Sequence, residues 1–259
     1  MLVGLADWLT AAGGYIGPVS IQEHAGVRGL VCTRDGVREG EPLLAVPREC
    51  TIQGFPAEGQ RPIERLIIAL LRARDEGSDG YFAPYIGSLP LEVPLLRDWD
   101  ADQLTRLHAP TVVAEVEEQR KWLERLCAAQ PAAPQADVRW AERLVRSRGI
   151  ACADEVCGAG LQLVPLLDFA NHRRHTADSS PAIVETGDGM TVLCASPAGK
   201  ELRAGDEITF AYTCDEGNAR LLLDYGFAQL GADEYVGLDE LDRRLDLESK
   251  ETAEQLWSW

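Results

Sequence analysis

The stretch VPLLDFANHRRHT, residues 164–176, places Asp168, Asn171 and His172 directly after an apolar run. Asp168 and His172 stand four residues apart, which on a helix would put two metal ligands on one face. A third ligand is not obvious, because His175 is only three residues further on and the C-terminal half contains no other histidine. Buried polar groups usually have partners or a ligand. Three interpretations follow: a metal site, a structural capping cluster or a ligand-binding corner.

Other residues that could do chemistry have ordinary structural interpretations. Tyr212 ends the stretch DEITFAY, and Tyr225 and Phe227 lie in DYGF. By residue type alone these are core aromatics, and a buried tyrosine there needs one partner for its hydroxyl. Arg148, preceded by Ser147, is either an exposed arginine at a helix end or a fork that binds a carboxylate through two hydrogen bonds.

Composition and charge bound the class of protein. The chain has 259 residues, 46% of them apolar, so it can bury a core as one large domain or as a core with an insertion. It has no apolar run long enough to span a membrane and no secretory signal at its start, which predicts a cytoplasmic or organellar protein, with a plastid as one option, and not a secreted one. The net charge of -17 argues against nucleic-acid binding and favours a basic partner, although solubility alone explains it as well.

Cysteine usage gives no sign of a metal site. The seven cysteines are an odd number without a CxxC pair, so neither a disulfide framework nor a zinc cluster is indicated. We interpret them as reduced and mostly buried thiols.

The chain divides into three blocks: a block of strands, a helical block and a second block of strands. Residues 15–47 alternate apolar and polar residues between turns, which predicts three short strands. From Pro62 the apolar residues recur at helical spacing up to about residue 150, and Asp137 is a plausible N-cap of the last of these helices. Strands return in LQLVPLLDF, PAIVETGDG, MTVLCAS and DEITFAY, followed by one helix over EGNARLLLDYGF. This order predicts one β core interrupted by a helical insertion.

The motifs LVPLLDFANH, AGDEITFAY and LLLDYGF, taken in this order, resemble the C-terminal motif series of SET-domain protein methyltransferases. The segments YFAPYIGSLP and RSRG resemble the helical insertion of the plant Rubisco large-subunit methyltransferase-like subclass. The resemblance implies a mainly β SET fold of small sheets with a C-terminal pseudoknot, interrupted by a helical insertion and α+β overall. It also implies four parts: the N-terminal SET core in 1–60, the insertion in 61–150, the C-terminal SET core in 151–230, and an acidic helical tail in 231–259. The tail would be the stub of a C-terminal substrate-binding domain.

The resemblance also implies S-adenosylmethionine as cofactor and assigns its contacts. Asn171 and His172 would hold the cofactor and Asp168 would orient the corner. Further expected contacts are Gly26, Val27, Arg28, Ser147 and Arg148. Val27 stands where relatives usually have glycine, so either this loop needs no positive φ there or cofactor binding is weaker.

The same resemblance makes Tyr212 the catalytic residue and a lysine side chain the methyl acceptor. Its hydroxyl and nearby carbonyl groups would position a neutral amine, and Tyr225 and Phe227 would wall the lysine channel while also contacting the cofactor. The implied substrate is a non-histone protein, with the lysine in a basic segment as one option. No nucleic acid, membrane or metal is expected, and the oligomeric state is open.

Two other classes of function stay open from the sequence. A catalytically weak or inactive SET-like module that binds a basic segment is favoured by Val27 and by the short tail, and opposed by Asn171, His172 and the two tyrosines. A metal-dependent hydrolase would use Asp168 and His172. A histidine-modifying relative exists in the same group, but the apolar Ile150 and Leu167 near the matched motifs argue for lysine.

Overall fold

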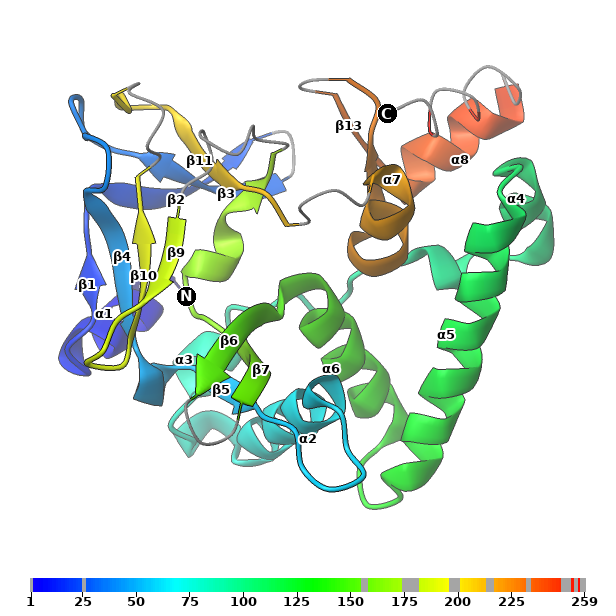
Figure 1. Ribbon diagram of the computed structural model, residues 1–259, viewed down its shortest axis with the longest axis horizontal. Coiled ribbons are helices and arrows are strands. Elements are labelled where there is room, and N and C mark those ends of the chain that lie inside the picture. The colour runs from blue at the N-terminus through cyan, green and yellow to red at the C-terminus, as the bar shows by residue number, and fades with distance from the viewer. Residues whose placement is uncertain are drawn as a thin grey trace. The chain divides into compact units, whose positions relative to one another are not determined.

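The computed structural model describes most of the chain, namely residues 2–24, 27–154, 158–173, 182–195, 201–212, 217–231, 234–247, 253 and 256 (Figure 1). The chain divides into two compact units. Unit 1 comprises Met1–Leu89 and Arg148–Tyr212, and unit 2 comprises Pro90–Ser147 and Thr213–Trp259. The insertion expected from residue 61 therefore contributes its first helix to unit 1, because that helix packs on a strand of this unit.

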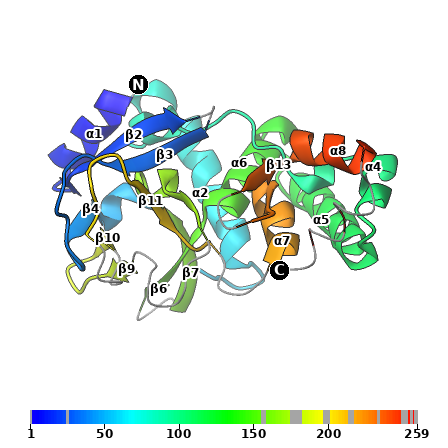
Figure 2. The same cartoon turned by 90° about the horizontal axis from the view of Figure 1, so that it is seen from above.

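Unit 1 is built on small sheets, as the resemblance implies, although residues 15–47 form four strands and not the three expected. Their strand orders are β1-β4-β10-β9, β2-β3-β11-β8 and β5-β7-β6. The strands are β1 (Tyr15–Ile16), β2 (Val19–His24), β3 (Val27–Cys32), β4 (Pro42–Pro47), β5 (Ile52–Gly54), β6 (Ile150–Asp154), β7 (Gly158–Leu163), β8 (Asn171–His172), β9 (Ala182–Glu185), β10 (Met190–Cys194) and β11 (Glu207–Phe210). Figure 2 shows β2, β3 and β11 side by side from above.

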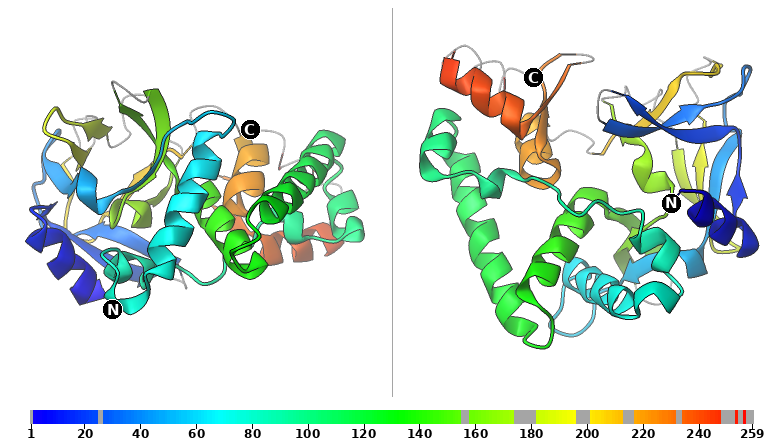
Figure 3. Two further views of the ribbon diagram at one scale, coloured as in Figure 1. Left: turned by 90° about the horizontal axis from the view of Figure 1, so that it is seen from below. Right: turned by 180° about the vertical axis from the view of Figure 1, so that it is seen from behind.

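The helices of unit 1 pack on these sheets and on one another. They are α1 (Leu2–Ala11), α2 (Pro62–Asp75) and α3 (Ala83–Ile86). The apolar face of α2 buries Leu66, Ile67 and Leu70 and packs against β5 and β7 (Figure 3). Gly54 of β5 permits this approach, because a Cβ there would lie 2.4 Å from the backbone nitrogen of Leu66.

Unit 2 is mainly helical and has its own core. Its elements are α4 (Ala101–Arg106), α5 (Pro110–Ala129), α6 (Gln135–Arg148, whose last residue belongs to unit 1), α7 (Gly217–Arg220), β12 (Phe227–Gln229), β13 (Tyr235–Gly237) and α8 (Leu238–Leu247). Leu96, Leu107, Val116, Leu222 and Leu241 are almost inaccessible to solvent in one apolar cluster. This burial explains why the helical spacing of the sequence continues through α4 and α5.

Some local predictions were wrong. Asp137 lies within the first turn of α6 and not at its N-cap, because the helix already begins at Gln135. The single helix expected over 216–227 is α7 followed by a π-helix, Leu221–Tyr225, and Phe227 already belongs to β12. The left-handed conformation of Gly226, with φ of 75°, ends the π-helix. Among the described helices none is long and apolar enough to cross a bilayer.

Candidate active site

Three separate parts of the sequence meet in the sheet β2-β3-β11-β8. Strand β11 pairs antiparallel with β3, aligning Glu207 with Val31, and parallel with the short β8, aligning Thr209 with Asn171. The polar residues that follow the apolar run 163–167 therefore lie beside the end of DEITFAY. We use the term ligand corner for Arg148, Asp168, Asn171, His172 and Tyr212, all of which belong to unit 1.

A side-chain hydrogen bond fixes Asn171. Its Nδ2 donates to Oε1 of Glu207 at 2.8 Å. Gly29 of the adjacent β3 makes room for this pair, because a Cβ at this position would lie 2.7 Å from Nδ2 of Asn171 and 2.8 Å from Oε1 of Glu207. With Nδ2 bound to the carboxylate, the amide oxygen of Asn171 is oriented as an acceptor.

His172 and Tyr212 bind each other across the two strands. Nδ1 of His172 accepts a hydrogen bond from the backbone N–H of Tyr212 at 3.1 Å, and their rings lie 5.3 Å apart. An accepting Nδ1 carries no proton, so a neutral His172 is protonated on Nε2. The hydroxyl of Tyr212 donates to the backbone oxygen of Ala170 at 2.9 Å. Because its hydrogen is used in this way, the phenolic oxygen can meet a ligand only as an acceptor.

Asp168 is buried between a tyrosine and an arginine. Its Oδ2 accepts from the hydroxyl of Tyr85 at 2.9 Å and lies 3.5 Å from Nη1 of Arg148, which also donates to the backbone oxygen of Asp168 at 2.6 Å. Burial raises the pKa of Asp168, while Arg148, Tyr85 and Arg28 act to lower it. Burial and the nearby carboxylate raise the pKa of Tyr85 well above its ordinary value. Tyr85 therefore stays a neutral donor to Asp168.

Oδ1 of Asp168 and Nε of Arg148 are buried in this corner and have no hydrogen-bond partner among the described residues. Orphaned buried polar atoms are costly, so in water or in a complex such atoms are normally bound. A carboxylate oxygen accepts and a guanidinium N–H donates, which suits a ligand that carries both an ammonium and a carboxylate group.

Two guanidinium groups lie near the ring of Phe169. The guanidinium carbon of Arg28 lies 5.0 Å from the ring centroid of Phe169, and that of Arg148 lies 5.8 Å from it. Nη1 of Arg28 also donates to the backbone oxygen of Ser88 at 3.3 Å. Aromatic faces attract cations, so the buried Phe169 holds both arginines beside the ligand corner.

The backbone turns sharply just before Asp168. Leu166 has φ of 66° and ψ of -40°, a conformation that side chains larger than glycine rarely adopt, and it is buried. The following 3₁₀ turn, Leu167–Phe169, presents Asp168 to Tyr85 and Arg148. Strain of this kind persists only where surrounding packing enforces it, and it is common at functional sites.

The other predicted site residues lie in different places. Gly26 is outside the described residues. Val27 begins β3, is 57% exposed and, within the described chain, is not among the non-glycine residues with positive φ. Ser147 donates to the backbone oxygen of Arg143 at 2.9 Å, so its hydroxyl is bound to its own helix in unit 2.

Tyr225 and Phe227 belong to unit 2, where their ring centroids lie 6.3 Å apart. Ion pairs anchor the π-helix that ends at Tyr225. Asp224 is buried and accepts from Nη1 of Arg146 at 2.8 Å, and Arg146 also donates to Glu142 at 2.8 Å. Glu142 in turn binds Arg97, and both are almost inaccessible to solvent. A π-helix is rare and often occurs at functional sites.

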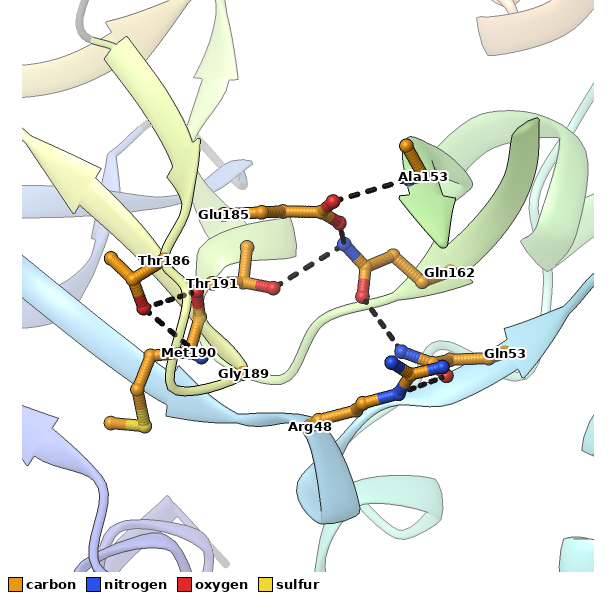
Figure 4. A pocket seen from close by; sticks show the side chains of 9 residues that line it. All are labelled: Arg48, Gln53, Ala153, Gln162, Glu185, Thr186, Gly189, Met190 and Thr191. Carbon is orange, nitrogen blue, oxygen red and sulfur yellow. Dashed lines mark hydrogen bonds between the residues drawn. The ribbon is translucent and has the colours of Figure 1, made fainter. Parts of the chain in front are cut away.

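A pocket of about 110 Å³ lies elsewhere in unit 1, between β5, β6, β7 and the β9–β10 hairpin (Figure 4). The buried Gln162 donates to Glu185 at 2.9 Å and to Thr191 at 3.3 Å, and it accepts from Gln53 at 3.5 Å. Glu185 also accepts from the backbone N–H of Ala153 at 3.1 Å. These bonds tie the sheets together, and no residue of the ligand corner lines the pocket.

The metal interpretation gains nothing from the geometry. Oδ2 of Asp168 is bound to Tyr85 and Arg148, and Nδ1 of His172 is bound to the backbone of Tyr212. In the part of the chain that the structure describes, no three His, Cys, Asp or Glu side chains gather to hold a metal ion.

Sequence reasoning missed four residues of this region: Gly29, Tyr85, Phe169 and Glu207. Gly29 had a usable signal, because a glycine inside a strand often marks a close approach. Glu207 lies within the predicted strand DEITFAY and begins β11, but nothing in the sequence aligns it with Asn171. Tyr85 is separated from Asp168 by 83 residues, so only the fold reveals their contact.

Comparisons with known proteins identify the fold. The chain aligns at 88% of its length, with a TM-score of 0.72 and 21% identity, with 57% of the chain in a crystal structure of the SET domain of LSMT bound to lysine and AdoHcy. The chain has a SET fold. A structure of Rubisco LSMT bound to AdoMet matches this SET fold with a TM-score of 0.70 and 22% identity over 87% of the chain and 55% of the solved chain.

Curated relatives with similar sequences confirm the resemblance read from the motifs. The ribulose-1,5-bisphosphate carboxylase/oxygenase large subunit N-methyltransferase of Pisum sativum, a chloroplastic protein, is 23% identical over 227 residues. The chloroplastic fructose-bisphosphate aldolase-lysine N-methyltransferase of Arabidopsis thaliana is 24% identical over 226 residues. Both matches cover 78% of this chain and about half of the relative's length, 45% and 46%. No family model matches the chain.

Proposed function

We propose that this SET fold is an S-adenosylmethionine-dependent protein-lysine N-methyltransferase that acts on a non-histone protein. The relatives are named for methylation of the Rubisco large subunit and of aldolase lysine, both non-histone proteins. The observation that carries the proposal is the ligand corner, where buried atoms of Asp168 and Arg148 without a partner in the described part of the chain lie in the same unit as the Tyr212–His172 pair.

The donor set of the corner fits the cofactor. Within the described residues Arg148 donates hydrogen bonds only through Nη1, toward Asp168. The other edge of its guanidinium, with the buried Nε, forms a fork for the carboxylate at the amino acid end of the cofactor. Oδ1 of Asp168 would accept from the ammonium group. Asn171 and His172 would bind the cofactor through backbone and side-chain atoms, and Arg28 would add positive charge beside Phe169.

Tyr212 would act on the methyl acceptor. When bound, the cofactor supplies a methyl group carried on a sulfonium sulfur. A lysine with a pKa near 10.4 must lose a proton first, which costs about 4.6 kcal/mol at pH 7 unless the site disfavours the ammonium. The phenolic oxygen of Tyr212 and the backbone oxygen of Ala170 lie at hydrogen-bonding distance from each other and would align the neutral amine.

The remaining assignments extend the same proposal. Tyr225 and Phe227 would wall the lysine channel and contact the cofactor, and the segment 26–28 and Ser147 would complete the cofactor site. The substrate would be a protein lysine, in a basic segment that suits the net charge of -17. The chloroplastic relatives support the organellar, plastid alternative for the compartment.

Calorimetric titration of the full chain with S-adenosylmethionine tests the proposal. We expect saturable binding, and transfer of labelled methyl to lysine in a protein substrate. Asn171→Ala should lower the affinity for the cofactor by about 10- to 150-fold, since a hydrogen bond to a charged ligand contributes about 1.5–3 kcal/mol. A folded chain without measurable affinity would refute the proposal. Tight cofactor binding without transfer to any candidate protein would favour a binding module.

A further inference from the structure

Tyr85 is the largest fully buried aromatic residue that touches the ligand corner. It belongs to α3, its side chain is 0% exposed, and its hydroxyl donates to Oδ2 of Asp168 at 2.9 Å. Neither the cofactor site nor the catalytic step assigned above uses it. The hydroxyl is too deep to meet solvent, so this one bond is what it contributes beyond packing.

The bond determines which oxygen of Asp168 faces a ligand. Oδ2 is shared between Tyr85 and Nη1 of Arg148, whereas Oδ1 is buried without a partner among the described residues. A carboxylate without the Tyr85 bond can rotate and pair with Arg148 through both oxygens, because a guanidinium prefers such a fork. That rotation would remove the acceptor and would occupy the arginine edge at the same time.

We propose that Tyr85 is a positioning residue, which holds Asp168 so that Oδ1 accepts the ammonium group and Arg148 keeps an edge for the carboxylate of an amino-acid-bearing ligand. This inference rests on the proposed function, since the ligand is the amino acid end of S-adenosylmethionine or S-adenosylhomocysteine. Tyr85 itself touches no ligand and acts through Asp168.

Tyr85→Phe isolates the hydroxyl, because it keeps the ring. Tyr81→Phe is the matched control, since Tyr81 lies in the same segment and its hydroxyl contacts Cys50 at 3.5 Å. The ligands are S-adenosylhomocysteine and 5′-methylthioadenosine, which keeps the nucleoside and thioether but lacks the amino acid end. We expect Tyr85→Phe to lower the affinity for S-adenosylhomocysteine by about tenfold and the affinity for methylthioadenosine by less than about twofold. Tyr81→Phe should change neither affinity.

The pH profile of S-adenosylhomocysteine binding gives a second readout that a packing role would not move. Asp168 faces Tyr85 of α3, Arg148 of α6 and Arg28 of β3. Burial raises the pKa of Asp168 and the Tyr85 hydrogen bond acts to lower it, so loss of the hydroxyl raises that pKa further. Binding requires the ionised carboxylate, and its acid limb should therefore move to higher pH in Tyr85→Phe.

The outcomes separate the two proposals. A wild-type chain that binds neither S-adenosylmethionine nor S-adenosylhomocysteine overturns the proposed function. A wild-type chain that binds S-adenosylhomocysteine, with Tyr85→Phe equal to it in affinity and in acid limb, overturns the role of Tyr85 alone. Equal weakening of both ligands with an unmoved acid limb would mean that Tyr85 only supports packing. If methylthioadenosine binds too weakly for titration, the acid limb alone decides.

Discussion

His172 and Tyr212 are joined by a hydrogen bond from a backbone to a ring: the N–H of Tyr212 donates to Nδ1 of His172 at 3.1 Å. The imidazole of His172 thus binds the backbone of Tyr212, whose hydroxyl donates a hydrogen bond to the backbone oxygen of Ala170. The position of the phenol is thus set from both ends, by its backbone and by its hydroxyl. Such pre-organisation is what a group needs if it acts mainly in a transition state.

Tyr212→Phe should therefore slow methyl transfer while leaving the cofactor bound. Loss of one hydroxyl and its bond to Ala170 costs about 1 kcal/mol of stability, whereas losing several kcal/mol of transition-state stabilisation slows turnover by about 100-fold or more. Single-turnover transfer at saturating cofactor measures the effect, with calorimetry as the control for binding. A variant as fast as wild type would remove Tyr212 from catalysis.

Gly29→Ala should disturb Asn171 without unfolding the sheet. The added Cβ would meet the ends of two side chains, Nδ2 of Asn171 and Oε1 of Glu207, and these can swing away more easily than backbone can. We expect a stability loss of about 1 kcal/mol, and cofactor affinity about tenfold lower.

Gly187→Ala is the matched control for Gly29→Ala. A Cβ at Gly187 meets nothing within 4 Å, so stability and affinity should stay close to wild type. Urea unfolding and cofactor titration measure both quantities. Unchanged cofactor affinity in a folded Gly29→Ala chain would contradict a role for the Asn171 side chain in the site.

Glu142→Gln should be strongly destabilising. It leaves Arg97, which is 5% exposed, without its carboxylate partner, and breaking a buried pair typically costs about 3–5 kcal/mol. Glu124→Gln removes the exposed partner of Arg139 and should cost at most about 1 kcal/mol. Urea denaturation compares them. Similar losses in the two variants would show that the buried pair has no special weight.

Alkaline pH should weaken the fold through Tyr81. Its hydrogen bond with Cys50, together with burial, raises the pKa of Tyr81 to about 12. The unfolded chain ionises this tyrosine near pH 10, so its stabilising contribution is complete below about pH 10 and is lost as pH rises toward the folded value. Urea unfolding between these pH values should show a shallower decline for Tyr81→Phe. An identical decline would exclude the raised pKa.

The sequence predicted the order of elements better than their pairing. Helical spacing from Pro62 and alternation in DEITFAY predicted α2 and β11, since both depend on local periodicity. The two-residue β8 has no periodic signal, and its parallel pairing with β11 depends on contacts distant in sequence. The π-helix could not be predicted for a related reason. Asp224 within it pairs with Arg146, which is distant in sequence, and the left-handed Gly226 ends it.

The candidate site was predicted in type but not in its supporting contacts. The polar residues of DFANH have partners, as their cost of burial required. Asp168 is bound by Arg148 and by Tyr85, and Tyr85 lies 83 residues away along the chain, so no local pattern pairs it with Asp168. Leu166 is a similar case, because a leucine gives no sign of a positive φ and only the packed turn imposes it.

The parallel pairing of β8 with β11 also bears on folding kinetics. Strand β11 must find both β3, near the start of the chain, and β8 before this sheet is complete. Closing such long loops costs conformational entropy before the strand contacts can stabilise the sheet, so this sheet should form late in folding. Helices such as α5 can form earlier from local contacts. A kinetically trapped chain would then keep much of its helical signal while lacking the joined His172 and Tyr212, and recovery of ligand affinity would mark the last stage of refolding.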